Sequence, residues 1–540
     1  MRKTYIALVI FLCVVAGILL GNMMARRANL ENSVNTIQML FRQLGQGNVV
    51  DELLHVINAH YFEEVDINQL TEDALIFILS ELDPHSTLIP ARDLADVNSE
   101  LEGSFSGIGV QFNIHNDTVL IISVINGGPS QRIGLLAGDR IVEVEDSVFV
   151  GPDLTNERVF RTLRGKRNTQ IRLGIKRRGV PEILHYTITR GDIPTHSIDI
   201  AYMIEPDVGY IRMSRFSATT YSEMLTAIAS LRNQGMRKLI LDLRENTGGL
   251  LDQAIMITNE FLPRGQLIVS SEGRAVRRLE ARADGSGNFV QQPLVILIDE
   301  FSASASEILA GAVQDNDRGL IIGRRSAGKG LVQQQITLSN GSAVRLTVSQ
   351  YFTPSGRSIQ RPFERGGGFA YEMEMWERLL HDDDTEAEVN TQFPDSAVYH
   401  TLKGREVHGG GGIMPDILMP RDMSNHTPYL NRVVGLLHQF AIQYSDQHRE
   451  QLNAFNTWQA MERHLLGQNL LHKFVAFAES RNVPPNWDEI NQSRQFIEQR
   501  LIASITRNML GEEGFFPLLN YHDPVVNRAL KELRTNEMFR

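Results

Sequence analysis

The chain has 540 residues, 42% of them hydrophobic, and a formal net charge of −11 at pH 7. This length predicts several domains with packed cores, and the acidic balance argues against general nucleic-acid binding. The single cysteine, Cys13, lies in an N-terminal apolar stretch, so no disulfide framework is expected.

The N-terminal segment, residues 1–27, has the pattern of an export signal. Arg2 and Lys3 precede an apolar run from about Tyr5 to Leu20. No small-x-small cleavage site follows, which favours an uncleaved signal anchor over a cleaved signal peptide. Leu12 before Cys13 argues against a lipoprotein signal. We therefore expect membrane attachment through this segment, with the rest of the chain on the extracytoplasmic, periplasmic side of a bacterial inner membrane.

Residues 28–98 are predicted to be mainly helical. Apolar residues recur at helical spacing over Val49–Tyr61 and Ile67–Leu82, and the second helix ends at the turn Asp83-Pro84-His85-Ser86. His85 is a candidate catalytic residue, but a loop histidine after Asp-Pro is more typical of a structural role.

Residues 99–192 contain short β-rich runs separated by glycines. Gly107-Ile108-Gly109-Val110 forms a glycine-rich turn into a strand, and a further strand (Val119–Ile125), GLLAGDRIVEVE and a helix near Thr155–Leu163 follow. This stretch resembles a PDZ domain, which implies that Gly107, Ile108, Gly109 and Val110 form a loop that binds the C-terminal carboxylate of a peptide. Ile108 and Val110 are then expected to favour an apolar last residue in that peptide.

Residues 193–420 alternate between strand and helix patterns. A strand at Val208–Met213, an amphipathic helix near Tyr221–Gln234 and a buried strand at Lys238–Leu243 predict an α/β domain with a covered sheet. The buried strand is followed by Gly248 and Gly249, which allow a backbone N–H to approach a ligand closely. The same glycines are equally typical of an ordinary entry into a helix.

Ser302, Ser304 and Ser306 lie between a buried strand (Pro293–Ile298) and an apolar helix (Ile308–Val313). A serine at such a turn is close to the N–H groups of a helix N-terminus, where an oxyanion is stabilised. Ser304 and Glu307 also fit a capping box, which would only start the helix.

Lys329 follows a strand at Gly319–Gly323, which can bring it beside Ser304 as a general base. Such a lysine must be neutral, and burial, for example by Leu331 and Val332, favours the neutral form. The amide oxygen of Gln333 can accept from the amine without adding a charge. An alternative is that Gly323–Lys329 begins a P-loop, but Gly330 stands where a Ser or Thr is needed.

The motifs LDLRENTGGLLDQA, FSASASEILAGAVQD, GKGLVQ, YFTPSGRSIQ and GGGGIMPD occur in this order. In this combination the chain resembles the C-terminal processing peptidases, or tail-specific proteases, from about Ala28 to Pro420, including the PDZ-like segment. The resemblance implies a Ser-Lys serine endopeptidase that acts on polypeptides with free C-termini. It also implies an α/β peptidase core of crotonase-like ββα arrangement with an inserted PDZ domain, flanked by helical N- and C-terminal regions.

By the matching motifs, Ser304 is the expected nucleophile, Lys329 the general base and Gln333 the residue that holds the lysine. The oxyanion hole is expected from the N–H of Ala305 and of Gly248 or Gly249. Thr247 stands where family members often have proline. No metal, nucleotide or organic cofactor is implied, and the alternative function is a PDZ scaffold with an inactive peptidase core.

Two stretches depart from the family pattern. Residues 361–399 are expected to be a long polar surface loop, with an acidic run, Asp382–Asp384, that is more typical of a solvated surface than of a metal site. Residues 421–540 are expected to form an amphipathic helical appendage for docking or dimerisation, so a homo-oligomer is possible. Trp458, Phe474 and Phe477 are its expected packing residues.

Overall fold

The computed structural model describes residues 49–125, 127–380 and 398–535, in two compact units that divide after Leu79. The expected signal anchor and the acidic run Asp382–Asp384 lie outside the described residues. Within the described part of the chain, none of the helices combines the length and the apolar character needed to cross a bilayer.

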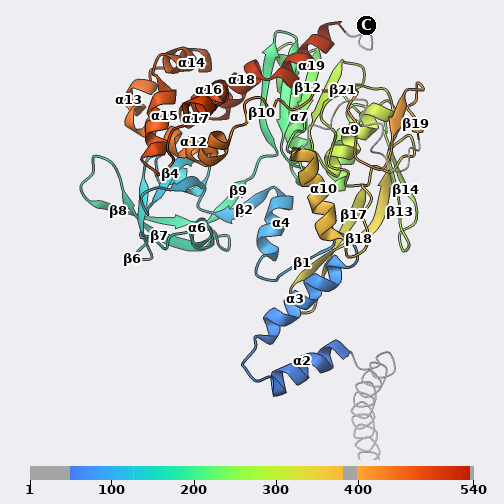
Figure 1. Cartoon of the computed structure of the whole chain (residues 1–540), viewed down its shortest axis with the longest axis horizontal. Helices are drawn as coiled ribbons and strands as arrows, with labels where there is room; N and C mark the ends of the chain where they lie inside the picture. Colours follow the sequence, from blue (N-terminus) through green and yellow to red (C-terminus); the bar gives the residue numbers. More distant parts are fainter. Residues whose placement is uncertain (1–48, 126, 381–397, 536–540) are drawn as a thin grey trace, which may run out of the picture. The chain divides into compact units, whose positions relative to one another are not determined.

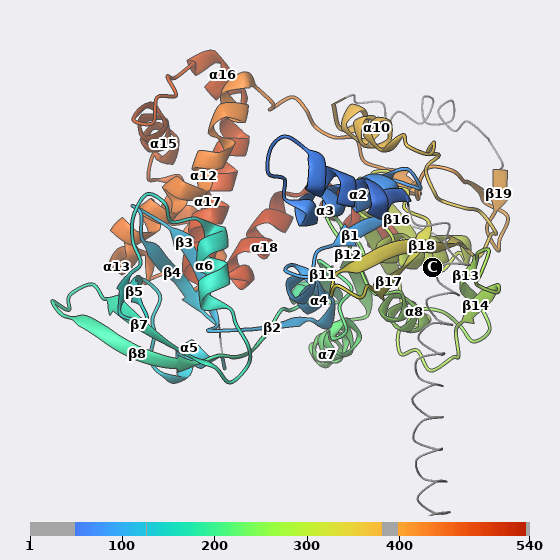
Figure 2. The same ribbon diagram turned by 90° about the horizontal axis from the view of Figure 1, so that it is seen from below.

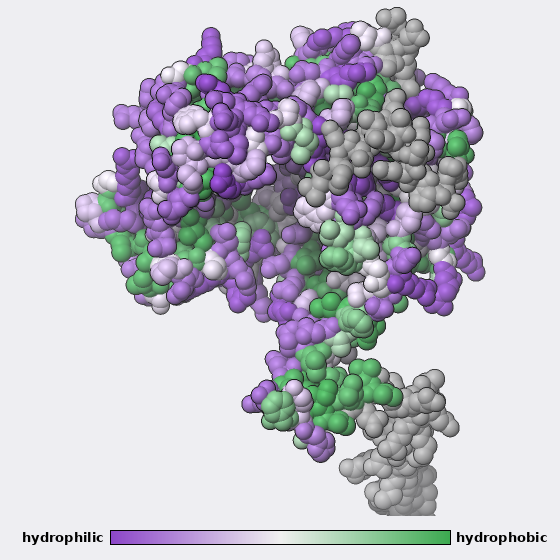
Figure 3. All heavy atoms as spheres, in the orientation of Figure 1, coloured by the Kyte–Doolittle hydropathy of each residue, from purple (hydrophilic) through white to green (hydrophobic). Residues whose placement is uncertain are grey.

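The first unit contains α2 (Val49–His60) and most of α3 (Ile67–Ser80), as the helical spacing predicted. Asp66 accepts hydrogen bonds from the N–H groups of Asn68 and Gln69 and so caps α3. Apolar side chains such as Leu53, Phe62 and Ile76 are exposed on this unit. Figure 3 shows hydrophobic residues gathered on its surface.

The peptidase sheet of the second unit has six strands in the order β10-β11-β12-β15-β16-β21 (Figure 1). β10 and β11 are antiparallel, and β11, β12, β15, β16 and β21 are parallel. The strands are β10 (Ile198–Glu205), β11 (Val208–Met213), β12 (Lys238–Asp242), β15 (Leu294–Ile298), β16 (Leu320–Gly323) and β21 (Ile417–Leu418). β12 and β15 are almost continuous apolar runs because both faces of the sheet are covered.

One face of this sheet packs against α7 (Thr220–Asn233), α8 (Leu251–Asn259) and α9 (Ala305–Asp315). On β12, Leu239 and Leu241 belong to this core, whereas Ile240 belongs to the core on the opposite face. This alternation is the two-residue period of a strand.

The opposite face is covered by α19 (Pro524–Thr535), which follows α18 (Glu512–His522). Val526, Ala529 and Leu533 of α19 are buried with Tyr210 and Ile240 of the sheet. The C-terminal region therefore is not only an appendage, because its last helix completes the core of the peptidase domain. The expectation from the sequence was wrong in this respect, since amphipathic spacing shows that a helix has an apolar face but not what covers it.

The preceding C-terminal helices form a core of their own, with Phe474 and Phe477 inside it and Trp458 packed against it. Figure 2 shows α12 and α17 side by side at its centre. The helices are α12 (Pro428–Gln447), α13 (Arg449–Leu452), α14 (Trp458–Leu466), α15 (Leu470–Glu479), α16 (Trp487–Gln492) and α17 (Arg494–Leu510).

A second sheet has five strands, with β18 (Ala343–Phe352) in the middle. The first residues of β18 pair with β17 (Leu331–Thr337) on one side and with β1 (Thr87–Ile89) on the other, and its last residues pair with β13. It also contains β13 (Leu267–Glu272) and β14 (Leu279–Arg282). A separate hairpin pairs β19 (Val398–His400) with β20 (Glu406–His408).

The stretch expected to be a polar loop contains a helix, α10 (Gly368–Leu380). Tyr371 is buried, and its ring lies 3.8 Å from the guanidinium carbon of Arg361. The loop expectation was therefore wrong for residues 368–380. The glycine run before this short amphipathic segment and the aspartate run after it are typical of loops and outweighed its helical spacing.

The β-rich segment enters and leaves through an antiparallel pair, β2 (Ser104–Gly107) with β9 (Gly191–Pro194). Between them lie a sheet and a separate apolar core that includes Ile121, Ile141 and Ile171. The elements are β3 (Val110–Ile114), β4 (Val119–Val124), α5 (Pro129–Arg132), β5 (Arg140–Val144), β6 (Ser147–Val148), α6 (Asn156–Leu163), β7 (Gln170–Lys176) and β8 (Ile183–Thr189). α4 (Leu94–Glu102) precedes the entry strand.

Candidate active site

The candidate catalytic residues follow the carboxyl ends of neighbouring parallel strands. The turn with Gly248 and Gly249 follows β12, Ser304 follows β15, and Lys329 follows β16. Because the strands are parallel, their carboxyl ends share one edge of the sheet, which is where ligands bind in open α/β sheets. Ser304, Lys329, Gln333, Gly248, Gly249 and Ala305 line one cavity of about 690 Å³.

The three serines of the turn differ in what their hydroxyls do. Ser302 donates to the carbonyl of Leu243 (2.8 Å), and Ser306 donates to the carbonyl of Asn246 (2.8 Å). Both residues are fully buried, so these hydroxyls hold the turn together. Ser304 is only partly buried and lines the cavity, so it is the serine that a substrate can reach.

The backbone of Ser304 has φ 54° and ψ −109°, a conformation that residues with a side chain rarely adopt. Strain of this kind collects at functional sites, where the surrounding structure must impose it. Nothing in the sequence indicated it, because the conformation depends on the contacts on both sides of the turn.

Glu307, on the first turn of α9, ties the serine and lysine segments together. One carboxylate oxygen accepts from the N–H of Ser304 (2.8 Å) and the N–H of Lys329 (2.9 Å). The other accepts from the N–H of Gly328 (2.7 Å) and the hydroxyl of Ser326 (2.5 Å). The predicted capping box is therefore present, and its carboxylate also fixes the lysine loop. The donor from Ser304 to Glu307 is its backbone N–H and not its hydroxyl, so this contact does not exclude reaction at Ser304.

The same contacts argue against the P-loop alternative. In a P-loop, the N–H groups before the helix bind phosphate oxygens. Here the N–H groups of Gly328 and Lys329 donate to Glu307, and the next element is the strand β17 rather than a helix. An internal carboxylate thus occupies the donors that a phosphate would need.

The amine of Lys329 donates to the amide oxygen of Gln333 (3.0 Å). The amide nitrogen of Gln333 donates in turn to the carbonyl of His85, which fixes which way the amide is turned. The hydroxyl of Tyr351 lies 2.8 Å from the backbone carbonyl of Lys329 and 3.1 Å from that of Ser304. The lysine amine is therefore held by a neutral acceptor.

Burial lowers the pKa of Lys329 from its usual 10.5, and the nearby Arg345 guanidinium lowers it further. Glu307 and Asp83 act in the opposite direction, but the net direction is downward. The neutral amine that a general base requires is thus favoured by the environment.

The turn after β12 requires glycine. Gly249 has φ 145°, and a side chain there would meet the carbonyl oxygen of Phe216 at 2.1 Å. The N–H of Gly248 is committed to the side chain of Asn246 (2.9 Å). Among the described residues, the N–H groups of Gly249 and Ala305 have no hydrogen-bond partner, so these two are available to an oxyanion.

Asn246 connects this turn to the serine turn. Its carbonyl accepts from the N–H of Ala303 (3.0 Å) and from Ser306, and its amide donates to the carbonyl of Met213 (2.9 Å). Sequence reasoning gave no role to Asn246 or Tyr351 and treated Glu307 only as a cap. Of these three residues, only Glu307 had a signal in the sequence, namely its position in the capping box.

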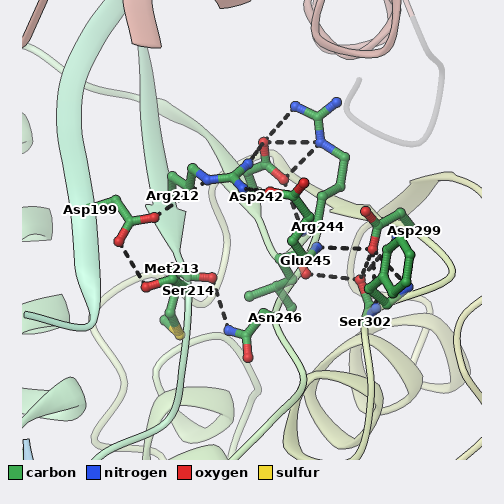
Figure 4. Close-up of polar contacts among 12 residues, drawn as sticks. Asp199, Arg212, Met213, Ser214, Asp242, Arg244, Glu245, Asn246, Asp299 and Ser302 are labelled. Atoms are coloured by element: carbon green, nitrogen blue, oxygen red, sulfur yellow. Dashed lines mark hydrogen bonds and ion pairs between the residues drawn. The ribbon is translucent and has the colours of Figure 1, made fainter. Parts of the chain in front are cut away.

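A network of charged side chains that includes Arg212, Asp242 and Arg244 lies beside the same turn (Figure 4). Asp242 accepts from Tyr210 (2.6 Å) and from Arg244 (2.6 Å), and Arg244 also pairs with Asp523 at the start of α19 (2.7 Å). Burial opposes ionisation of Asp242, but Arg244 and Arg212 outweigh it and hold the pKa of Asp242 below its usual value.

His85 contributes to the site through its carbonyl rather than its imidazole. Its ring nitrogen lies 3.2 Å from the hydroxyl of Tyr371, and burial, as the largest cause, lowers the pKa of His85 to about 4. The ring is therefore neutral near pH 7. Within the described ranges, no group of three or more His, Cys, Asp or Glu side chains could hold a metal ion.

The predicted carboxylate-binding loop lies between β2 and β3, with Gly109 at φ 79°. The carbonyls of Ile108 and Gly109 accept from the N–H groups of Ser130 and Ile125 (both 3.0 Å), so the loop is fixed by its carbonyl side. The side chain of Ile108 is only 2% exposed and belongs to the apolar core. On β3, Phe112 contacts Phe160 of α6, with 5.0 Å between ring centroids.

Comparisons with known proteins identify the parts of the chain. A model of peptidase family S41 matches residues 207–369, and a PDZ domain model matches residues 106–185. A family of unknown function matches residues 429–511. The first match contains Ser304, Lys329 and Gln333, and the second contains the Gly107–Val110 loop.

Named relatives extend the match over most of the chain. It is 37% identical to a carboxy-terminal-processing protease of Bartonella bacilliformis over 356 residues, covering 64% of this chain and 79% of the relative. It is 33% identical to the carboxy-terminal processing protease CtpA of Bacillus subtilis over 306 residues, covering 56% of this chain and 65% of the relative. A solved photosystem II D1 C-terminal processing protease is 28% identical, with 57% of this chain and 89% of that one covered and a TM-score of 0.33.

The fold and these matches define a serine peptidase that carries a PDZ domain. The chain belongs to the carboxy-terminal-processing proteases of peptidase family S41. No comparison supports the alternative of an inactive scaffold.

Proposed function

We propose that Ser304 is the nucleophile of this protease and that Lys329 is its general base. The observation that carries the proposal is the buried amine of Lys329, which is held by the neutral oxygen of Gln333 in the cavity that Ser304 lines. In the first step the amine takes the proton of the Ser304 hydroxyl while its oxygen attacks the carbonyl carbon of the substrate. The resulting oxyanion accepts hydrogen bonds from the N–H groups of Gly249 and Ala305.

In the second half of the reaction, the lysine ammonium gives its proton to the leaving amine, and an acyl-serine remains. Water then attacks the acyl group, Lys329 takes a proton from that water, and collapse of the intermediate returns the proton to Ser304. No step needs an aspartate, because burial and Gln333 maintain the neutral amine.

We also propose that the PDZ domain binds the free C-terminus of the substrate through the Gly107–Val110 loop. The order of the loop, β3 and α6 along the chain and the contact between Phe112 and Phe160 support this assignment. Because Ile108 is buried, the apolar contact to the last substrate residue comes from the β3 and α6 side chains instead.

The apolar run between Tyr5 and Leu20 supports the further proposal that the enzyme is anchored in a membrane and acts on its extracytoplasmic side. Cell fractionation with protease accessibility of the C-terminal region tests it. Protection of that region in intact spheroplasts would contradict it. Light scattering of the purified enzyme would test the proposed homo-oligomer.

Substitution of Ser304 tests the catalytic assignment. Ser304→Ala is expected to lower kcat/KM by at least about 10³-fold while peptide binding is retained. Ser222→Ala is a matched control, because Ser222 is exposed on α7 and bonds only the carbonyl of Thr219. Retained proteolysis in Ser304→Ala would overturn the assignment.

Recognition of the C-terminus is tested with paired peptides that end in a free carboxylate or an amide. At low substrate concentration the amide is expected to be cleaved more slowly, because the loop binds a carboxylate. Equal rates would reduce the PDZ domain to a structural part.

A further inference from the structure

The catalytic cavity contains more positive charge than its catalytic role explains. Besides Lys329, its lining includes two guanidinium groups, Arg215 and Arg345, and one carboxylate, that of the exposed Glu100. Among the described residues, neither guanidinium makes an ion pair or a hydrogen bond with another residue. By contrast, the buried guanidinium of Arg357 is paired with Asp315 at 2.8 Å.

Arg345 is the more unusual of the two. It lies on β18, opposite Gln335 of β17 and Thr87 of β1, so strands on both sides fix its backbone. Its Nη2 nitrogen is screened from solvent and has no hydrogen-bond partner among the described residues. A desolvated guanidinium nitrogen without an acceptor is costly, and such a group is normally paired with an anion.

The missing acceptor fits a carboxylate. A guanidinium presents parallel N–H groups that match the two oxygens of a carboxylate. Lys329 does not compete for this anion in its neutral form. Arg215 is less suited to bind a carboxylate, because none of its nitrogen atoms is both buried and without a hydrogen-bond partner among the described residues.

We propose that Arg345 binds a carboxylate side chain of the substrate beside the scissile bond and makes an acidic residue at one position a determinant of cleavage. The proposal rests on the assignment of Ser304 and Lys329 as the reacting pair. It adds a specificity for sequence near the cut to the recognition of the C-terminus by the PDZ domain. A cavity of about 690 Å³ has room for side chains that flank the cut as well as for the reacting peptide bond.

The test uses a peptide that the enzyme cleaves at a bond located by mass spectrometry. One Glu is placed in turn at each position from four residues before that bond to four residues after it, and each Glu peptide is paired with its Gln counterpart. The C-terminus is constant, so PDZ binding is the same within each pair. The ratio of kcat/KM for Glu over Gln then reports carboxylate recognition alone.

The ratio is expected to be about tenfold or more at one position, as for a hydrogen bond to a charged group. In Arg345→Gln the ratio at that position should fall to near one, in Arg345→Lys it should be intermediate, and in the matched control Arg215→Gln it should persist. Removal of the Arg345 charge also affects Lys329, but both peptides of a pair share that effect, so the ratio remains interpretable.

A flat profile in the wild-type enzyme, or a preference that survives in Arg345→Gln, would overturn the proposal. A second arm uses peptides that end one to three residues after the cut, as free acid or amide. A preference for the free acid that only Arg345→Gln removes, with no effect of internal Glu, would assign Arg345 to the α-carboxylate and overturn the acidic-residue determinant. Continued cleavage by Ser304→Ala would instead refute the underlying catalytic assignment.

Discussion

Two buried polar clusters of the peptidase domain differ in how their charged side chains are paired. Around Asp242, the carboxylate is matched by Arg244 and Arg212, and Arg244 is matched again by Asp523. Around Lys329, the amine faces the uncharged amide of Gln333, and Arg345 has no anion among the described residues. Both clusters lie next to loops that follow parallel strands, so position alone does not distinguish them.

The difference indicates which cluster supports the fold and which performs chemistry. The paired arginines keep Asp242 ionised, and Asp242 also accepts from the backbone N–H of Arg244 at the start of the loop that carries Gly248 and Gly249. Burial, together with the charge of Arg345, lowers the pKa of Lys329, and such perturbed groups are typical of catalytic sites. The following predictions test this contrast, from the largest effect to the smallest.

Removal of the lysine amine is expected to have the largest effect. Lys329→Met and Lys329→Arg should each lower kcat/KM by at least about 10³-fold, because methionine has no base and arginine stays protonated. The thermal midpoint of Lys329→Met should not fall, since an apolar side chain replaces a buried amine. A clear drop in that midpoint would show that the amine stabilises the fold.

The protonation of Lys329 should also shape the pH dependence. Since the neutral amine is the active form and its pKa lies below 10.5, kcat/KM should rise with pH through an apparent pKa below that value. Gln333→Glu places a carboxylate against the amine, which favours the ammonium form and should move the rise to higher pH by about one unit or more. Gln333→Met removes the acceptor without adding charge and is the control. A profile that shifts equally in both variants would contradict the role given to the amide.

A substitution in the paired cluster around Asp242 should lower the stability of the fold rather than the rate of the reaction. Asp523→Asn removes the charge that faces Arg244 but keeps the oxygen that caps α19 at Val525. We expect the free energy of unfolding to fall by about 1 to 3 kcal/mol, with kcat/KM of the folded enzyme changed less than tenfold. Asp488→Asn is the control, because Asp488 lies exposed in the first turn of α16. A large loss of activity without a loss of stability would place this cluster in the catalytic machinery.

The sequence predicted the elements that carry the site because their patterns are local. Continuous apolar runs predicted the strands before Ser304 and Lys329, whereas the glycine pair after Lys238–Leu243 left a ligand-binding turn and an ordinary helix entry equally open. The chemistry of a buried lysine beside a glutamine could also be stated from residue types and motif order.

The remaining features depend on contacts between distant segments. The carboxylate of Glu307 binds donors from two loops, and α19 packs against strands more than 200 residues earlier in the chain. The positive φ of Ser304 likewise depends on contacts on both sides of its turn. No window of sequence contains both partners of such contacts.

The most direct test of the account is the site of acylation. The enzyme is mixed with an activated peptidyl ester, quenched in acid within one turnover, digested and mapped by mass spectrometry. The account predicts one acyl group on Ser304, and none in Lys329→Met quenched at the same time. An acyl group on Ser302 or Ser306, or turnover of the ester without any acylated serine, would contradict it.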